Sequence, residues 1–471
     1  MSIDDQRVKL FLNQDVPLDS ISEEKIRHVL SFDDISKIVV LPDIHSKPDN
    51  PIPTGIATLT KRTIYPFAIG QEIGCGVRVL KTSLHRDDIS DDEINALFKN
   101  ITSLLRDSLR KDALLSKEEY IDILMDGYKW AEENCPLEKK SKAQKGEPML
   151  PGGIKVPSRR RLLKIIPKDA FRGGFYRFGV LGGGNHFLEL QEVDEIFEED
   201  IASEMGLRKG SLVFMFHTGS GVFSKRADNY YGIRYQDHRW DKELRANIRK
   251  LLFHSNDFNL GRLPLRYDIF MKKNYKGIPQ GTPEAERFLT VLNAALNYSY
   301  VNRCLISKFI QESVSKCISA ACDIQLVADV AHERIDLEDF NGTPFWVHRN
   351  GASRLEYLEG DKTTLVPLPG FPGGPSFLCV PQEGLRASFC SVNHGAGRRL
   401  TKSQARKTFE EDEIIDSFKY KKIKLYKLGR ENASEQAPEA FKDVHKVLNV
   451  LRDTKLTKPV VSTKPLAIIK G

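Results

Sequence analysis

Four histidines that are far apart in the chain share one local setting. Each lies at or beside a short apolar segment with glycine or alanine neighbours, and the four are His186, His217, His332 and His394. Short apolar segments between turn residues are typical of buried strands. Other stretches, such as residues 88–134 and 284–305, have helical periodicity. The sequence therefore predicts an α/β (α+β) protein whose strand ends carry imidazoles.

The first 50 residues contain a helix signal followed by a strand signal. Residues 20–30 read as a helix, for which Ser22 is the expected N-cap before an acidic first turn. The apolar segment 38–41 reads as a strand that runs into Asp43-Ile-His45. An Asp-x-His pair after a strand could bind a metal or a substrate. The alternative is a turn closed by local hydrogen bonds.

Glu72 and Cys75 add a carboxylate and a thiol to the four imidazoles. They lie three residues apart in a turn that glycines interrupt, just before an apolar strand. Carboxylate, thiolate and imidazole together suit Mn, Fe, Co or Zn, and one thiolate bridging two metals would hold a phosphoryl group from both sides. The alternative is that Cys75 packs as a small apolar residue.

His394 lies in a glycine-rich loop, Ser391-Val-Asn-His-Gly-Ala-Gly-Arg398. Glycines let backbone N–H groups approach an anion closely, and an arginine such as Arg398 can bind phosphate oxygens. A neutral imidazole can attack phosphorus and later leave. These features favour a nucleophile, whereas a histidine in such a loop can also be purely structural.

Composition narrows the class of protein. The 471 residues include 71 Lys and Arg against 64 Asp and Glu, a net charge of +7. This mild basic bias is compatible with a nucleic-acid partner and does not require one. There is no apolar run of ~18 residues, no secretory signal, and seven scattered cysteines do not suggest a disulfide framework. We expect a protein of the cytoplasm, or of the nucleus if eukaryotic, without a membrane partner.

Taken together, the motifs resemble the RtcB-type RNA-splicing ligase family, the GTP- and manganese-dependent enzymes that join RNA ends through a guanylated histidine. The resemblance runs from about Leu41 to Gly471, and its marks, in family order, are IGCGVR, LGGGNHFLE, HTGS, DVAHE, VHRNGASR, ASF, NHGAGR, APEAFKDV and IKG. It implies a single catalytic domain over residues 1–471, with central β-sheets flanked by helices. A basic loop is expected at about 136–167 and a variable insertion at about 223–300. The basic loop reads as solvated, and the alternative is contact with an RNA backbone.

The resemblance also implies a role for each matching position. His394 would be the nucleophile that takes GMP, and Cys75 would bridge two Mn²⁺ ions. The ligands that complete the two metal sites would be Glu72, His186, His217 and His332. The residues around GTP or GMP would be Asn185, Glu189, Ser388, Gly395, Ala396, Gly397, Arg398, Phe441 and Lys470. The candidates for RNA contact are Arg349, Arg354 and Arg386.

Several positions depart from the family pattern. Glu72 stands where the family usually has aspartate, and Gly221 follows the HTGS motif where the family has arginine. Asn350 replaces a lysine, and Phe441 replaces a tyrosine. The nucleotide and metal positions are largely kept while several phosphate-contacting positions have changed. This pattern indicates a divergent paralogue with a different RNA end or partner.

The function that the resemblance implies is an RNA ligase of tRNA splicing or RNA repair. It would join RNA 3′-phosphate or 2′,3′-cyclic phosphate ends to 5′-hydroxyl ends through a GTP-derived histidine–GMP intermediate. One alternative is a histidine guanylyltransferase that caps 3′-phosphates without ligating, which the losses at Gly221 and Asn350 favour. Another is a non-catalytic RNA-binding subunit, which the changes at Glu72 and Gly74 favour. The sequence does not identify a protein partner.

Overall fold

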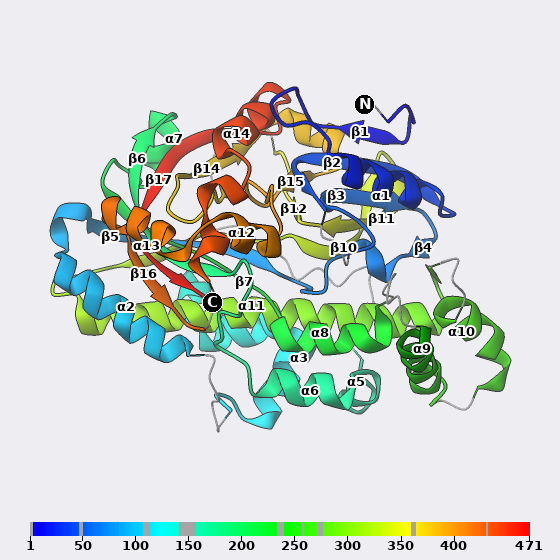
Figure 1. Ribbon diagram of the computed structural model, residues 1–471. Coiled ribbons are helices and arrows are strands. Elements are labelled where there is room, and N and C mark those ends of the chain that lie inside the picture. Colours follow the sequence, from blue (N-terminus) through cyan, green and yellow to red (C-terminus); the bar gives the residue numbers. More distant parts are fainter. Residues whose placement is uncertain are drawn as a thin grey trace.

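The computed structural model describes residues 3–46, 50–106, 113–140, 157–232, 240–256, 259–271, 277–358, 364–429 and 432–471. Within these ranges the chain has a mixed α/β architecture, as predicted, with β-sheets above a layer of helices (Figure 1). The strands are β1 Val8–Leu10, β2 Ile35–His45, β3 Thr54–Thr60, β4 Thr63–Ile64, β5 Gly76–His85, β6 Phe187–Ile196, β7 Ser211–Thr218, β8 Ile278–Pro279, β9 Ile324–Ala331, β10 Glu333–Phe340, β11 Thr343–Asn350, β12 Ala352–Arg354, β13 Val366–Leu368, β14 Ser376–Pro381, β15 Ser391–Asn393, β16 Lys424–Lys427 and β17 Thr457–Lys470. The helices are α1 Ser20–Leu30, α2 Asp91–Leu105, α3 Lys117–Asn134, α4 Pro136–Lys140, α5 Arg159–Ile165, α6 Lys168–Phe175, α7 Glu199–Glu204, α8 Gly221–Tyr231, α9 Trp240–His254, α10 Leu263–Phe270, α11 Pro283–Cys317, α12 Lys402–Thr408, α13 Glu411–Tyr420 and α14 Val444–Asp453.

The larger sheet brings four of the predicted site positions to one edge. Its strand order is β13-β14-β17-β6-β7-β5-β9, and β16 also pairs with β17. The register aligns Gly76 of β5 with Thr218 of β7 and with Ala331 of β9, and it aligns Phe187 of β6 with His217. Cys75, His186, His217 and His332 therefore lie at neighbouring strand ends.

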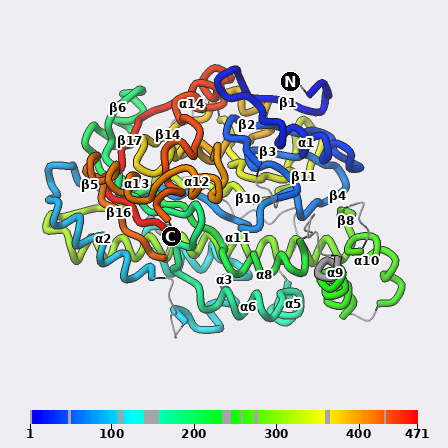
Figure 2. Tube along the Cα trace, viewed as in Figure 1, coloured from blue at the N-terminus to red at the C-terminus, as the bar shows by residue number. Residues whose placement is uncertain are grey.

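A second sheet, with the order β1-β2-β3-β11-β10, contributes the end of strand β2 to the site. Strand β2 carries Asp43 and His45 near its end. Strand β11 pairs with β3, so residues near 348 lie beside residues near 58 (Figure 2). The short strands β12 and β15 pair with each other, and Asn393 lies opposite Ala352. His394 thus follows a strand that is fixed between the two sheets.

Helix α11 organises the layer beneath the sheets. The predicted helix at 284–305 is confirmed but is longer, because it continues to Cys317. Thr282 caps its start, and Pro283 takes the first helical position. It lies in one layer with α3, α5 and α8 (Figure 1). Its Arg303 and the β5 residue Arg78 both form ion pairs with buried Asp329 of β9. These ion pairs connect the helix to the sheet.

The predicted helix at residues 20–30 is also confirmed as α1, but its predicted cap is wrong. Asp19 is the N-cap residue, and its carboxylate accepts a hydrogen bond from the backbone N–H of Ser22 at 2.8 Å. Aspartate and serine are both favourable caps. Asp19 rather than Ser22 is the cap because the first helical turn begins at Ser20.

The predicted basic loop and the predicted variable insertion both contain helices. In the 136–167 region, α4 and α5 lie at the two ends, and residues 141–156 lie outside the described residues. The 223–300 region contains most of α8, then α9, α10 and the first half of α11, while residues 233–239, 257–258 and 272–276 lie outside the description. None of the described helices is long and apolar enough to cross a membrane.

Candidate active site

Five predicted ligands lie together and form two groups that share one thiol. Cys75 Sγ is 3.0 Å from His217 Nε2 and 3.2 Å from His186 Nε2. His217 Nε2 is 3.2 Å from His332 Nε2, and His186 Nε2 is 2.8 Å from Glu72 Oε2. In each group, Cys75–His217–His332 and Glu72–Cys75–His186, the donor atoms lie within 4.8 Å of one another. Cys75 belongs to both groups.

The protonation states of these groups suit metal ligation. Burial, together with neighbouring imidazoles, holds the pKa values of His217 and His332 well below their usual range, so both rings are neutral at neutral pH. Burial would raise the pKa of Glu72, but the nearby His186 and Lys225 lower it below its usual range. Lys225 Nζ lies 2.6 Å from Glu72 Oε1, on the carboxylate oxygen that does not face His186.

The donor set fits two divalent cations. Neutral imidazoles, a carboxylate and a thiol are the ligands that borderline metals prefer, and a coordinating thiol is deprotonated by the cation. The three donors of the Cys75–His217–His332 group are all buried, whereas Glu72 is partly exposed. The Glu72 donor oxygen nevertheless lies within 4.8 Å of the Cys75 thiol. The glutamate thus reaches the shared thiol at the position where the family pattern has aspartate.

His394 lies beside the two ligand groups, and one of its ring nitrogens has hydrogen-bond partners. Its Nδ1 is 2.7 Å from Asp43 Oδ2 and 2.9 Å from the carbonyl oxygen of Gly351. Both neighbours are acceptors, so Nδ1 carries the proton and Nε2 keeps its lone pair. The ring centroid is 4.6 Å from that of His332 and 6.4 Å from that of His217. Burial lowers the pKa of His394, but the Asp43 contact outweighs it and raises the pKa above its usual value.

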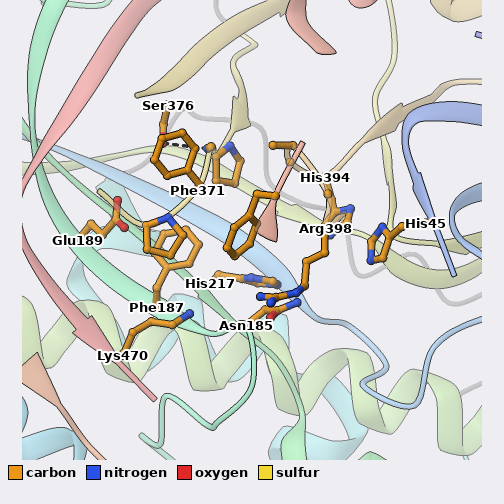
Figure 3. A pocket seen from close by; sticks show the side chains of 17 residues that line it. His45, Asn185, Phe187, Glu189, His217, Phe371, Ser376, His394, Arg398 and Lys470 are labelled. Atoms are coloured by element: carbon orange, nitrogen blue, oxygen red, sulfur yellow. Dashed lines mark hydrogen bonds between the residues drawn. The ribbon is translucent and has the colours of Figure 1, made fainter. Parts of the chain in front are cut away.

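A pocket opens next to His394 and encloses about 620 Å³ of empty space, solvent at its mouth included. Figure 3 shows His394, Arg398 and His45 on one side and Glu189, Phe187 and Lys470 on the other, with His217 between them. The lining residues are His45, Asn185, Phe187, Glu189, His217, Pro369, Gly370, Phe371, Pro372, Ser376, His394, Gly395, Ala396, Gly397, Arg398, Phe441 and Lys470. The lining combines aromatic and apolar side chains with a few charged groups, as is typical of small-molecule sites.

Strand β6 supplies one wall of the pocket through its alternation. The strand begins at Phe187, so Asn185 and His186 precede it in a turn and His186 points to Cys75. Phe187 and Glu189 line the pocket, whereas Leu188 and Leu190 face the core beneath the sheet. Burial raises the pKa of Glu189 to about 7, although Gln191, which donates to it at 2.6 Å, and the charge of Lys470 both act to lower it.

The opposite wall is formed by Arg398 and Phe441. The guanidinium carbon of Arg398 lies 4.5 Å from the centroid of the Phe441 ring, and the two residues form an isolated β-bridge. Arg398 also donates to the carbonyl oxygens of Leu400 and Glu435 at 3.0 and 3.1 Å. Its side chain is thereby fixed against the ring, which presents a rigid aromatic and cationic surface.

The structure does not place every predicted residue in the pocket. Ser388 is fully buried and donates to the Leu385 carbonyl oxygen, whereas Ser376 lines the pocket. Arg349 is fully buried in ion pairs with Asp336 and Glu338, which leaves it no surface for RNA. Arg354 pairs with Glu338 and Glu356. Arg386 is exposed, and its guanidinium lies 5.7 Å from the Tyr357 ring centroid.

Sequence reasoning missed several residues of the site. The sequence allowed two interpretations of Asp43, as part of a functional pair or of a turn. Its contact with His394 joins residues that are 351 positions apart in the chain. Phe187 was detectable, because it shares a strand face with Glu189. Phe371 lies in the Pro/Gly-rich segment 365–374 and Ser376 follows it, and neither gave a local signal. Lys225 lies in the first turns of α8, after the His217 motif.

Fold and site together define a class of protein in which a histidine held at its Nδ1 stands between a pocket and two groups of potential metal ligands. The family model described as "tRNA-splicing ligase RtcB" matches residues 25–471. The chain therefore belongs to the RtcB family of tRNA-splicing ligases, which are RNA ligases.

Relatives that carry the RtcB name come from diverse organisms. The chain is 29% identical to the tRNA-splicing ligase RtcB of Aeropyrum pernix, a match that covers 92% of this chain and 88% of the relative. It is 28% identical to the protein of the same name from Thermococcus kodakarensis, over 92% and 87% of the two chains. It is 29% identical to RNA-splicing ligase RtcB homolog 2 of Entamoeba dispar, over 94% and 82%.

Proposed function

We propose that this protein joins RNA 3′-phosphate or 2′,3′-cyclic phosphate ends to 5′-hydroxyl ends through a GMP adduct on His394. The observation that carries this proposal is the position of His394. Its Nδ1 is held by Asp43 and Gly351, and its ring lies between the pocket and the Cys75 donor groups. A complete donor set beside such a histidine supports an enzyme rather than a non-catalytic RNA-binding subunit.

In the first step, Nε2 of His394 attacks the α-phosphorus of GTP, and pyrophosphate leaves as the P–N bond forms. Asp43 holds the proton on Nδ1 and stabilises the positive charge that develops on the ring. The carboxylate is fully buried, so no solvent competes for this contact. The raised pKa of His394 agrees with a site that favours the charged imidazole.

The pocket supplies recognition of the nucleotide. Glu189 offers carboxylate acceptors for the N–H groups of a guanine, and Phe187, Phe371 and Phe441 offer surfaces for the base and sugar. Arg398, Lys470 and the glycines around Ala396 provide positive charge and backbone N–H groups for phosphates. Ser376, whose hydroxyl oxygen accepts from Gln191 Nε2 at 3.4 Å and from the backbone N–H of Gly370 at 3.2 Å, is a better candidate for this site than Ser388.

The metal ligands would be Cys75, His217 and His332 for one divalent cation and Glu72, Cys75 and His186 for the other. Mn²⁺ is the proposed ion, on the strength of family membership and a mixed N, S and O donor set. When bound, the two cations supply electrostatic stabilisation of the phosphoryl charge. Lys225 holds the second oxygen of Glu72, so only one oxygen faces the donor group.

Two further steps complete the reaction. An oxygen of the RNA 3′-phosphate attacks the phosphorus of the adduct, and the P–N bond breaks and releases neutral His394. The 5′-hydroxyl of the second RNA end then attacks the activated 3′-phosphate and expels GMP. A 2′,3′-cyclic phosphate must first be hydrolysed to a 3′-phosphate.

A joining assay tests this proposal. The purified protein is incubated with GTP, Mn²⁺ and two RNA oligonucleotides, one ending in a 3′-phosphate and the other beginning with a 5′-hydroxyl. The proposal predicts a joined product that disappears when the 3′-phosphate is removed beforehand. Accumulation of a GMP-capped 3′ end without joining would instead identify a guanylyltransferase that caps ends.

A further inference from the structure

Lys442 lies where three segments of the site meet. It follows Phe441 of the pocket wall, and its backbone N–H donates to the carbonyl oxygen of Gly397 in the His394 loop at 3.0 Å. Its side chain reaches in another direction, to the end of β2. There Nζ donates to the carbonyl oxygens of Pro42 and Ile44 at 3.0 and 2.5 Å. One residue therefore ties the nucleophile's loop to both neighbours of Asp43.

The ammonium group is placed where burial is unfavourable. Burial lowers the pKa of Lys442 to about 8, while the charges of Asp43 and Asp19 act to raise it. A buried ammonium is costly unless it is paired and hydrogen-bonded. The Asp43 carboxylate is fully buried too, and its Oδ1 has no hydrogen-bond donor in the part of the chain that the structure describes. The charge of Asp43 therefore offsets part of the cost of burying the ammonium.

The packing around Asp43 leaves little room for displacement. Gly397 lies so close that a Cβ there would be 2.4 Å from the carbonyl oxygen of Asp43. The Asp43 carboxylate meets both the backbone N–H of His394, at 3.2 Å, and Nδ1 of its ring. Any shift of the Pro42–Ile44 backbone would therefore move the carboxylate that orients the imidazole.

We propose that Lys442 is a positioning residue for the nucleophile. Its ammonium fixes the backbone on both sides of Asp43, and Asp43 in turn fixes the tautomer and the direction of His394. This inference rests on the proposed function, because it assumes that His394 takes GMP. The Lys442 side chain does not line the pocket, and its ammonium donates to the two β2 carbonyl oxygens.

The test compares Lys442→Ala and Lys442→Met with the matched control Lys446→Met. Lys446 lies four residues away and pairs with Asp15 at the surface. At saturating GTP, both Lys442 variants should form the His394–GMP adduct at least about tenfold more slowly, since a displacement of about 1 Å costs up to about 100-fold. The Kd for GTP should change little, and the control should behave as the wild type.

Rescue by a small amine distinguishes positioning from folding. Ethylammonium or propylammonium added to Lys442→Ala should restore part of the lost rate, because the cation can occupy the vacated space between the two carbonyls. The same amines should not accelerate Lys442→Met, whose side chain fills that space.

Two outcomes would overturn the inference. Wild-type adduct rates in both Lys442 variants would leave the proposed function intact and remove the role of Lys442. Slow rates in both variants without amine rescue, together with a lowered Tm, would assign Lys442 to folding alone. An absence of adduct in the wild-type protein would instead contradict the proposed function, so the two failures are distinguishable.

Discussion

Asp43 and His394 are 351 positions apart in the chain, and they meet with 2.7 Å between Oδ2 and Nδ1. Strand β2 brings the carboxylate, and the β12–β15 pair brings the imidazole. The carboxylate also accepts from the backbone N–H of His394, so it fixes both the loop and the ring. In the proposed mechanism, this contact leaves Nε2 as the reacting atom.

The Asp43→Asn variant should form the His394–GMP adduct about 100-fold more slowly or worse, as is typical when a positioned acid–base group is lost. The amide has the same shape, but its NH₂ group can donate to Nδ1 and stabilise the wrong tautomer. Single-turnover incorporation of labelled GMP measures the effect. Metal content and Tm serve as controls and should stay close to the wild type. An unchanged rate would show that Asp43 does not orient the nucleophile.

Removal of the shared thiol should empty both metal positions, whereas removal of an unshared ligand should weaken one. We expect Cys75→Ala to lose both ions, because the thiol belongs to both donor groups, and His332→Ala to lose one. Metal content after dialysis against Mn²⁺ provides the measurement. Cys317→Ser is the matched control, because Cys317 lies at the end of α11, outside both donor groups. Equal losses in the Cys75 and His332 variants would contradict a bridging role.

Binding of GTP should strengthen as the pH rises through about 7. Burial raises the pKa of Glu189 from its usual value to about 7, so the carboxyl is largely protonated below that pH and ionised above it. The protonated acid has lost an acceptor that guanine requires. We expect the Kd for GTP to fall by several-fold between about pH 6 and 8, within the about tenfold change that one pKa unit represents.

The matched variant for this prediction is Glu189→Gln. Its neutral amide cannot titrate, so it should bind GTP weakly at every pH and show a flat profile. Isothermal titration calorimetry at several pH values measures both proteins. A profile in the variant that is as steep as in the wild type would assign the pH dependence to another group.

Arg349→Ala should destabilise the fold and should not act through RNA. The substitution removes one of the two cations that pair with each of the buried carboxylates of Asp336 and Glu338, a loss of up to about 3–5 kcal/mol in the free energy of unfolding. Arg386→Ala, at an exposed position, should change this free energy by less than about 0.5 kcal/mol. Urea unfolding compares the two variants. A fully stable Arg349→Ala protein would show that the buried ion pairs contribute little.

The strand-end histidines were predictable because their signal is local. His217 and His332 each follow an apolar run, and a strand end next to glycine or alanine is visible in the sequence. What the sequence could not supply was the register that aligns Gly76 with Thr218 and Ala331. The convergence of the donors on one edge follows from that register, which is a property of strand pairing over long separations.

Two other outcomes show the limit of local patterns. Ser376 and Ser388 both precede phenylalanine, but Ser376 begins β14 and lines the pocket, whereas Ser388 ends a 3₁₀ turn and faces inward. Arg349 carries the charge expected of an RNA contact. In the structure, β11 pairs with β10, and the Arg349 side chain faces two buried carboxylates. Burial and strand face, which depend on tertiary structure, decided both cases.

The most direct test of the account is incubation of the protein with α-labelled GTP and Mn²⁺, followed by denaturing electrophoresis. The account predicts a labelled protein band that is labile in acid and stable in base, as a phosphoramidate is, and that is absent from His394→Ala. A band that persists in His394→Ala, or no band from the wild-type protein with any divalent metal, would contradict it.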